Sequence, residues 1–455
     1  MKKVVVLLLA FCLTFSMMPV NAAYHYSNDN PNKHVVATEP ATKTETVTQP
    51  VTQPVTQPVT VVPNNNAINV KDYNAKGDGK TDDTSAIQNA LNKSDSVYIP
   101  DGTYMINVDQ SLKPNSNQTI TMNANAVLKA ISSSRGEQYV ITIDGVTNVS
   151  IIGGKIVGER NEHQGLDGEW GMGINVVNGS SNIVIKDTTI SDCWGDGIYL
   201  GGSPAVNTIT IDGVTSDNNR RQGLSITNAK NVLINNSVFK NTNGTAPEAG
   251  IDIEPNVNQA AEDIKIMNTQ CYGNNQSGID ILGNNGGIQR VEITDCTIKD
   301  NVGLGILLFE ASGITFANTS VTNNKDDGVE ILRNVSNIIF KNMTFSENTN
   351  RGVSIVNSGE NARIEKISFE NTVISNNSQG QAGTEDGVRI DNWEPTGYIK
   401  DIQFYNTQFI DDQKVATQRY GMISGHSENI SGVFLNSDCV FKGNIDGDKH
   451  VQFAL

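Results

Sequence analysis

A short motif that recurs along most of the chain limits the folds open to it. The motif is a glycine followed by an apolar, a variable and an apolar residue, as at residues 173–176 (Gly-Ile-Asn-Val) and 250–253 (Gly-Ile-Asp-Ile). From Gly173 to Gly421, the steps between successive motif glycines are 24, 26, 27, 28, 27, 23, 24, 35 and 34 residues. A repeat of this length indicates a solenoid in which each repeat forms one coil.

A second apolar segment recurs between the motif glycines, as at residues 183–185 (Ile-Val-Ile) and 338–340 (Ile-Ile-Phe), with Asn-rich turns on either side. Apolar residues alternate with a period of two, which is typical of strands. One short strand cannot bury a face alone, but coils stacked ~4.8 Å apart bury their apolar residues in a common bore. The sequence therefore predicts an all-β, right-handed parallel β-helix, a solenoid spanning residues 67–455.

The first 66 residues have a different character. Residues 1–22 combine Lys2 and Lys3, a short apolar run and a small-residue cleavage site, which predicts a secretory signal peptide and an extracellular location. Residues 23–66 repeat Val-Thr-Gln-Pro and predict a disordered linker rich in Thr, Pro and Gln, which would associate the protein with a cell wall. No later segment is apolar enough to insert into a membrane.

Residues 67–125 predict an N-terminal cap for the solenoid. Residues 81–84 (Thr-Asp-Asp-Thr) offer N-cap side chains to a short amphipathic helix with Ala86, Ile87, Ala90 and Leu91 on one face. An open stack of coils exposes an apolar end, which such a helix would cover. We therefore expect the acids of residues 78–83 to serve turns and the helix cap.

Charge and cysteine content exclude two classes of function. The net charge of −16 becomes −18 once the two lysines of the signal peptide are removed, which disfavours nucleic-acid binding. The four remaining cysteines show no metal-ligand spacing and are too few for a disulfide scaffold. We expect buried free thiols, with no bridge between Cys271 and Cys296.

Aligning the coils on their glycines places the second residue after each glycine in one outward column. The column runs Asn175, Tyr199, Ser225, Asp252, Asp280, Leu307, Glu330, Ser354 and Arg389, with Glu254 and Asp391 two positions further along their strands. Asp252 and Asp280 fall on neighbouring coils, ~5 Å apart, and two carboxyl groups that close raise each other's pKa. An acid that keeps its proton beside an ionised carboxylate is what cleavage of a glycosidic bond requires.

We therefore predict a catalytic cluster of Asp252, Glu254 and Asp280, whereas a solvated acidic ladder is the structural alternative. Insertions at residues 159–170 and 241–248 enter this face, and exposed Trp side chains often stack on sugar rings. His163 is expected at the surface. The candidate substrate-binding residues are Tyr199, Trp170, Arg220, Arg221, Glu330, Arg389, Asp391 and Trp393.

The cap segment resembles that of the pectate-lyase superfamily. The similarity lies in residues 68–73 (Ile-Asn-Val-Lys-Asp-Tyr), 77–84 (Gly-Asp-Gly-Lys-Thr-Asp-Asp-Thr), 86–88 (Ala-Ile-Gln) and 98–104 (Tyr-Ile-Pro-Asp-Gly-Thr-Tyr). This superfamily of right-handed β-helix proteins includes polygalacturonase-like, pectate-lyase-like and alginate-epimerase-like members. The chain departs from their catalytic motifs, so the resemblance implies the fold and a polysaccharide substrate but carries over no catalytic residue.

Three functions remain open from the sequence. The first is a glycoside hydrolase with paired carboxylates, which requires no cofactor. The second is a polysaccharide lyase or uronan epimerase, in which Arg220, Arg221 or Arg389 would neutralise a uronate and the acidic column would hold Ca²⁺. The third is a non-catalytic glycan-binding protein or adhesin.

Overall fold

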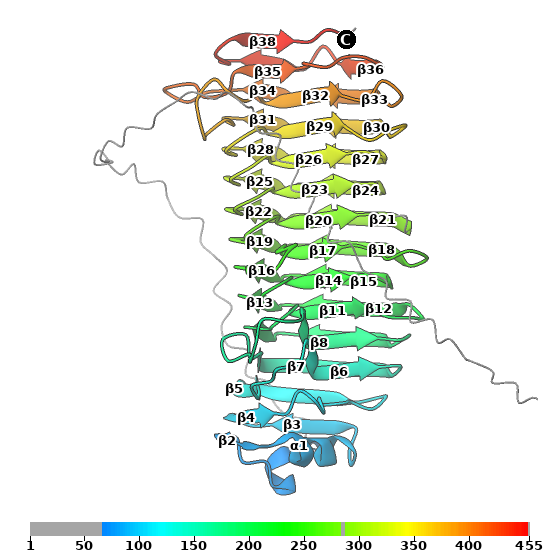
Figure 1. Ribbon diagram of the computed structural model, residues 1–455, viewed down its shortest axis with the longest axis vertical. Coiled ribbons are helices and arrows are strands. Elements are labelled where there is room, and N and C mark those ends of the chain that lie inside the picture. Colours follow the sequence, from blue (N-terminus) through cyan, green and yellow to red (C-terminus); the bar gives the residue numbers. More distant parts are fainter. Residues whose placement is uncertain (1–65, 284–286, 454–455) are drawn as a thin grey trace, which may run out of the picture. The chain divides into compact units, whose positions relative to one another are not determined.

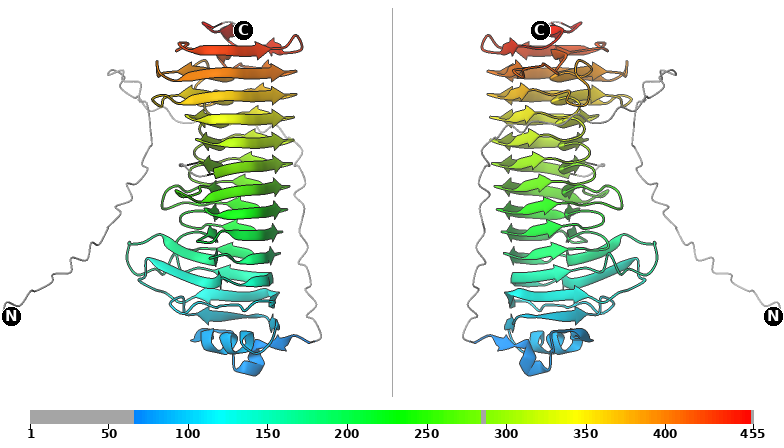
Figure 2. Two further views of the ribbon diagram at one scale, coloured as in Figure 1. Left: turned by 90° about the vertical axis from the view of Figure 1, so that its right-hand side faces the viewer. Right: turned by 90° about the vertical axis from the view of Figure 1, so that its left-hand side faces the viewer.

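The computed structural model describes residues 66–283 and 287–453, which form the predicted right-handed parallel β-helix. The coils stack along one axis, with the N-terminal segment at one end and the last strands at the other (Figures 1 and 2). The predicted signal peptide, and the predicted linker up to residue 65, lie outside the described residues.

One side of the solenoid is a parallel sheet of 12 strands, which we call sheet B. The apolar residues of the glycine motif point into the bore from this sheet, and the variable residues point outward. Its strands are β6 (Glu137–Asp144), β8 (Trp170–Val177), β11 (Ile198–Gly201), β14 (Leu224–Ile226), β17 (Ile251–Ile253), β20 (Ile279–Leu282), β23 (Ile306–Phe309), β26 (Val329–Leu332), β29 (Val353–Asn357), β32 (Val388–Asn392), β35 (Tyr420–Ile423) and β38 (Gly447–His450).

Two further strands complete each coil and belong to a second parallel sheet of 26 strands. The longer series is β9 (Ser181–Lys186), β12 (Val206–Asp212), β15 (Ala229–Asn235), β18 (Ala260–Met267), β21 (Gly287–Thr294), β24 (Ser312–Ala317), β27 (Val335–Lys341), β30 (Arg363–Glu370), β33 (Tyr398–Tyr405) and β36 (Ile430–Leu435). The shorter series is β10 (Thr189–Ser191), β13 (Thr215–Asp217), β16 (Val238–Lys240), β19 (Gln270–Tyr272), β22 (Thr297–Lys299), β25 (Ser320–Thr322), β28 (Thr344–Ser346), β31 (Val373–Ser375), β34 (Gln408–Ile410) and β37 (Val440–Lys442).

The bore is filled by identical or similar side chains stacked from coil to coil. Phe340 and Phe369 occupy the same register position on neighbouring coils, and their rings stack with centroids 4.8 Å apart. Phe404 continues the stack at 4.8 Å from Phe369. Burying an apolar side chain of this size stabilises the fold by about 1.5–3 kcal/mol, so a repeated residue contributes at every coil.

A ladder of buried asparagines holds one turn of successive coils in register. The side-chain amide of Asn301 donates to Asn324 Oδ1 at 2.9 Å, and Asn324 donates to Asn348 Oδ1 at 3.0 Å. Asn348 continues the ladder to Asn377 at 3.0 Å. All four side chains are fully buried, so each amide must find its partner on the next coil. The Asn-rich turns of the sequence are therefore partly structural.

The N-terminal cap consists of β1 (Ile68–Asn69), the 3₁₀ helix η1 (Val70–Tyr73), β2 (Asp78–Asp82), α1 (Thr84–Leu91), β3 (Ser96–Ile99) and β4 (Gly102–Ile106), and the long strands β5 (Thr119–Ala130) and β7 (Thr147–Val157) connect it to the coils. As predicted, α1 buries Ile87, Ala90 and Leu91.

The acids of the cap serve the backbone, as expected. Asp82 Oδ1 accepts a hydrogen bond from Thr84 N at 3.0 Å, at the start of α1. The carboxylate of Asp83 accepts from Lys76 N and Gly77 N at 2.6 and 3.0 Å. Asp78 accepts from two backbone N–H groups of its own turn, which lower its pKa to about 2.

The four described cysteines are free; Cys193, Cys271 and Cys296 are buried as expected, with no bridge between the last two, whereas Cys439 is only partly buried. Burial raises the pKa of Cys193 and Cys271, so both remain neutral thiols inside the bore. Within the described residues, no helix has the length and apolarity needed to span a membrane.

Candidate functional site

The predicted outward column is confirmed by the register of sheet B. Each strand pairs in parallel with the next, and the paired positions run Asn175, Tyr199, Ser225, Asp252, Asp280, Leu307, Glu330, Ser354 and Arg389. The glycine of each motif therefore aligns the coils as the sequence predicted. Asp252 on β17 and Asp280 on β20 are direct neighbours.

Asp252 and Asp280 are buried although they point away from the bore. Their side chains belong to residues that are only 2% and 3% exposed. Asp252 Oδ2 accepts a hydrogen bond from the Gln222 amide at 2.9 Å, whereas Oδ1 of each aspartate is buried without a hydrogen-bond partner. A buried ionised carboxylate with an unsatisfied oxygen is costly, which favours the protonated form.

The electrostatics follow from this burial. Loss of solvation, then the negative charge of Glu254, raises the pKa of Asp252 well above its usual range, with a further contribution from Asp280. Loss of solvation and the charge of Glu254 raise the pKa of Asp280 to about 7, against the opposing hydrogen bond from Ser277. A carboxyl group that holds its proton at neutral pH beside another carboxylate can act as a general acid.

Sequence reasoning missed a fully buried aspartate beside the predicted cluster. Asp196, the residue before the motif glycine Gly197, forms an ion pair with Arg221 at 3.2 Å and accepts a hydrogen bond from Ser225 Oγ at 2.8 Å. Burial raises the pKa of Asp196, and Arg221 opposes that rise. Asp196 and Arg221 also act on the pKa of Asp252 in opposite directions. We call Asp196, Arg221, Asp252, Glu254 and Asp280 the acid cluster.

A signal for Asp196 was present in the sequence. The residue before the motif glycine is an acid in three coils, at Asp196, Asp327 and Asp386, and each of these pairs with an arginine of the next coil. Asp327 contacts Arg351 at 3.4 Å, and Asp386 contacts Arg419 at 2.9 Å. Reading this position as a second column would have shown the pattern.

The two predicted substrate-binding arginines that precede β14 are engaged by the protein itself. Arg220 lies over the ring of Trp194, 3.8 Å from its centroid, and donates to Gly168 O at 2.9 Å. Arg221 is largely buried against Asp196. Both guanidinium groups thus make contacts within the protein, and a uronate contact by either of them stays a prediction.

Glu330 lies two coils beyond Asp280, with Leu307 between them in the column. Burial and the charges of Asp327 and Asp326 raise the pKa of Glu330 to about 8. Glu330 therefore lies in a second group of acids, with Arg351 bridging Asp327 and Glu385.

The predicted contacts at the far end of sheet B differ in exposure. Asp391 lies on the outward face beside Arg389, as predicted, but it is fully buried there and accepts from Arg389 Nε at 2.5 Å and from Gly425 N at 2.7 Å. The backbone N–H groups of Gly425 and His426, which follow β35 on the next coil, both donate to Asp391 Oδ1. Trp393 is 46% exposed and lies with its ring centroid 3.4 Å from that of His426.

Tyr199 and Trp170 lie at the other end of the column. Tyr199 is half-buried, and its hydroxyl lies 2.8 Å from Thr227 Oγ1 on the next coil. Trp170, at the start of β8, is 42% exposed. Trp170 therefore offers an exposed aromatic surface at the end of the 159–170 insertion.

The expectation that His163 lies at the surface is wrong. Its side chain is only 1% exposed, because the ring stacks on Trp194 with centroids 3.8 Å apart and an interplanar angle of 9°. His163 Nδ1 also lies 2.8 Å from Glu159 Oε1. Nothing in the local sequence pairs His163 with Trp194, which is 31 residues away, so the contact could not be predicted.

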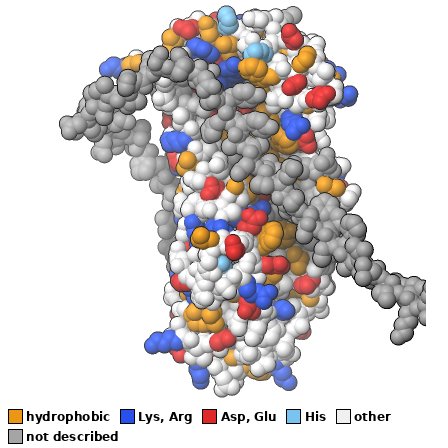
Figure 3. All heavy atoms as spheres, in the orientation of Figure 1, with side chains coloured by type: hydrophobic (Ala, Val, Ile, Leu, Met, Phe, Trp, Pro, Cys, Tyr) orange, Lys and Arg blue, Asp and Glu red, His pale blue; other side chains and the backbone are white. Residues whose placement is uncertain are grey.

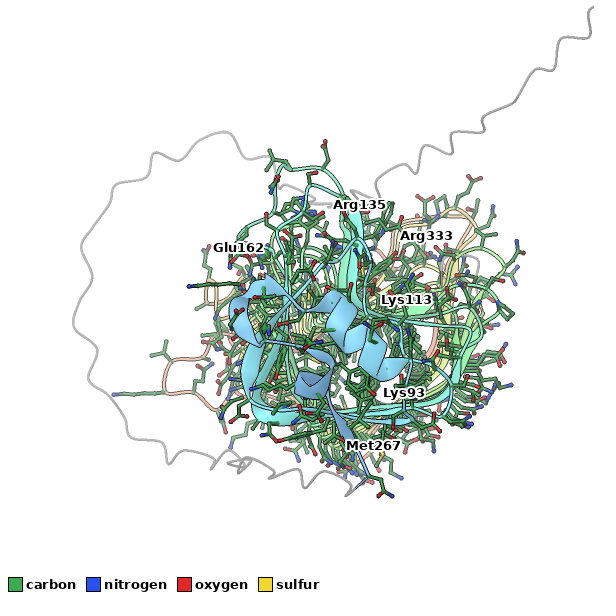
Figure 4. The ribbon with its side chains drawn as sticks, turned by 90° about the horizontal axis from the view of Figure 1, so that it is seen from below. Lys93, Lys113, Arg135, Glu162, Met267 and Arg333 are labelled. Carbon is green, nitrogen blue, oxygen red and sulfur yellow. The ribbon has the colours of Figure 1, made fainter. Side chains whose placement is uncertain are left out.

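Charges on this side of the molecule are interspersed. In the space-filling view, acidic and basic side chains lie next to one another rather than in separate patches of one sign (Figure 3). Seen from below, Glu162 of the 159–170 insertion and Met267, the last residue of β18, lie at separate places on the rim of the solenoid (Figure 4). Glu162 pairs there with Lys129 of β5, a strand of the 26-stranded sheet, at 3.0 Å.

The acid cluster can supply protonated and ionised carboxyl groups side by side. Among residues 66–283 and 287–453, no three or more His, Cys, Asp and Glu side chains are arranged to hold a metal ion. The Ca²⁺ site of the lyase interpretation stays a prediction.

Comparisons with known proteins agree with this fold. A family model described as rhamnogalacturonase A/epimerase, pectate lyase-like, matches residues 67–330. The uncharacterized protein YclG of Bacillus subtilis (strain 168) is 34% identical over 224 residues, which cover 41% of this chain and 38% of YclG. The chain spans less than two fifths of the length of the first curated relatives that it matches.

Two solved structures illustrate the range of proteins with this architecture. The A-module of the mannuronan C-5 epimerase AlgE4 from Azotobacter vinelandii has a TM-score of 0.59 at 18% identity, covering 85% of this chain and all of that module. The pre-mature gene product 12 of bacteriophage phi29 has a TM-score of 0.60 at 17% identity, covering 84% of this chain and 57% of that protein. At these identities the likeness shows the fold alone.

Proposed function

The chain belongs to the rhamnogalacturonase A/epimerase, pectate-lyase-like family, and on that premise we propose that it is a glycoside hydrolase that cleaves an extracellular polysaccharide with the acid cluster. The observation that carries the proposal is the pair formed by Asp252 and Asp280. They occupy the same register position on adjacent strands, each with one buried oxygen that has no hydrogen-bond partner. A substrate oxygen placed there would receive a proton or a hydrogen bond from the protonated acid.

Asp280 is the better candidate for the general acid. Its pKa is raised to about 7, so at neutral or mildly acidic pH it holds the proton that the leaving oxygen of the sugar requires. Glu254 follows β17 and is less buried than the two aspartates, and its negative charge raises the pKa of both. We assign Glu254 the role of the ionised base.

Strand geometry then favours inversion at the anomeric carbon. Glu254 is two residues along the chain from Asp252, so it lies diagonally from Asp280, at roughly 8 Å. Separations of about 6.5–9.5 Å between carboxyl groups leave room for a water molecule, whereas about 5–5.5 Å accompanies a covalent intermediate. The ion pair with Arg221 holds Asp196 in place, and the hydrogen bond from Gln222 holds Asp252.

A panel of polysaccharides tests this function. Release of reducing sugar without absorbance from unsaturated product is the result expected for a hydrolase. Unsaturated product would identify a lyase and overturn the hydrolase proposal. Conversion of the sugar without cleavage would identify an epimerase, the activity named for the structurally similar AlgE4 module, and binding without turnover would identify a glycan-binding protein or adhesin.

Secretion is part of the proposal. Residues 1–22 would direct export, and residues 23–66 would tether the β-helix near a cell wall and its polysaccharides. Detection of a mature N-terminus near residue 23 in protein recovered outside the cell is the expected result, and an uncleaved N-terminus would contradict it.

A further inference from the structure

Three side chains from separate parts of the chain form a continuous stack beside the acid cluster. Arg220 lies 3.8 Å from the ring centroid of Trp194, and Trp194 stacks on His163 at 3.8 Å. His163 in turn contacts Glu159 Oε1 at 2.8 Å, and the side chains of His163 and Glu159 are each 1% exposed. A cation on an aromatic ring is worth about 0.5–2 kcal/mol, depending on how far both groups are desolvated.

We infer that the Arg220–Trp194–His163 stack is a positioning element, which fixes the 159–170 insertion so that Glu169 lies against Arg221 at the edge of the acid cluster. The inference rests on the proposed function, because it assigns a role in that reaction to residues outside the reacting groups.

The contacts of the stack lead directly to Glu169. Arg220 Nη1 donates to Gly168 O at 2.9 Å, and Trp194 Nε1 donates to Asp167 O at 3.3 Å. The stack thus holds the two backbone carbonyls that precede Glu169. Glu169 Oε2 then lies 4.0 Å from Arg221 Nε, a nitrogen that is buried and makes no hydrogen bond.

A displacement of Glu169 would reach the reacting groups through Arg221. Arg221 already pairs with Asp196 at 3.2 Å, and the charge of Glu169 competes for the same guanidinium. The charged groups that act on Asp252 are Glu254 and Asp280, which raise its pKa, Arg221, which lowers it, and Asp196, which raises it. Without Glu169, the positive charge of Arg221 would act more strongly on Asp252 and Asp196 and lower their pKa.

The second insertion packs on the same arginine. Thr245 N donates to Arg220 O at 2.9 Å, and Arg160 of the first insertion donates to Asn243 of the second at 2.6 Å. Both insertions are therefore connected to Arg220, the second directly and the first through the stack, and Arg160 joins them to each other.

The test compares Trp194→Ala and Glu169→Gln with the parent, in the full mature chain. We expect both variants to lower the pKa of Asp252 by on the order of half a unit and to lower turnover, whereas the alkaline limb of the pH–rate profile, which Asp280 sets, should keep its position. Trp194→Phe keeps an aromatic face under Arg220 but loses the Nε1–H donor to Asp167 O, so its effect should be smaller than that of Trp194→Ala. Glu162→Gln is the matched control, because it removes an acid of the same insertion that pairs with Lys129 at 3.0 Å, outside the stack.

An infrared titration of the carboxyl groups in ligand-free protein, with Asp252→Asn as the reference, provides a readout that does not require activity. A lower titration midpoint for the carboxyl group of Asp252 in Trp194→Ala and Glu169→Gln, but not in Glu162→Gln, supports the inference. An unshifted titration in folded Glu169→Gln overturns it, even if Trp194→Ala does not fold. If the parent degrades no polysaccharide, the proposed function fails, and the infrared titration still decides whether the stack positions Glu169.

Discussion

At the scale of single residues, the burial of Asp280 links stability to function. Its pKa is about 7 in the folded protein, compared with 3.8 for an unperturbed aspartate. A folded protein keeps a destabilising group of this kind mainly where the group has a task. The cost appears only when the carboxyl must ionise, so it depends on pH.

Replacing Asp280 by Asn should therefore stabilise the protein at alkaline pH. Relative to the unfolded chain, stability due to the raised pKa is fully present below about pH 4 and is lost as pH rises through about 7. Asn at position 280 cannot ionise. The free energy of unfolding of Asp280→Asn should therefore equal that of the parent at pH 4 and exceed it by at most about 4 kcal/mol above pH 7. Denaturant unfolding at both pH values measures this gain, and equal stability of both proteins at pH 8 would contradict it. Glu292→Gln, an exposed replacement on β21, is the control.

The pH dependence of activity follows from the same carboxyl group. If Asp280 donates a proton to the leaving sugar oxygen, turnover should fall as pH rises through about 7, because the acid loses its proton there. A pH–rate profile between pH 4 and 9 measures this limb. Constant turnover up to pH 9 would remove Asp280 from the role of acid.

At the scale of the elements, α1 closes the apolar end of the bore with Ile87 and Leu91. Ile87→Asp or Leu91→Asp would place an unpaired charge in that contact and should cost several kcal/mol. Asn89→Asp adds the same charge on the exposed face of α1 and should cost little. Thermal unfolding compares the three variants. Equal melting temperatures for all of them would show that α1 does not cover the stack.

The strands were predictable and the turns were not. The glycine motif aligned the coils, so the column from Asn175 to Arg389 and the Asp252–Asp280 pair followed from sequence. The burial of Asp391 and the stack of His163 on Trp194 depend on the path of loops whose lengths vary from coil to coil. Sequence spacing contains no information on which side chains such loops bring together, so these contacts required the structure.

At the scale of the whole molecule, the β-helix is a scaffold that displays one row of side chains along sheet B. The bore and the asparagine ladder make every coil similar inside, so outward positions are free to vary without loss of the fold. Under the proposed function, the acidic net charge of −16 and the pairing of the arginines near the cluster favour a neutral or weakly charged stretch of polysaccharide as the substrate.

The most direct test of the account is the turnover of Asp252→Asn, Glu254→Gln and Asp280→Asn on a polysaccharide that the parent protein degrades. Each replacement keeps the size of the side chain and removes a carboxyl of the acid cluster. We predict that each variant loses turnover by at least about 100-fold, whereas Glu330→Gln, two coils beyond Asp280, loses much less. Circular dichroism would confirm that the β-helix remains folded. Parent-like turnover in all three variants would contradict the account and place the chemistry elsewhere, with the 159–170 insertion as the next region to examine.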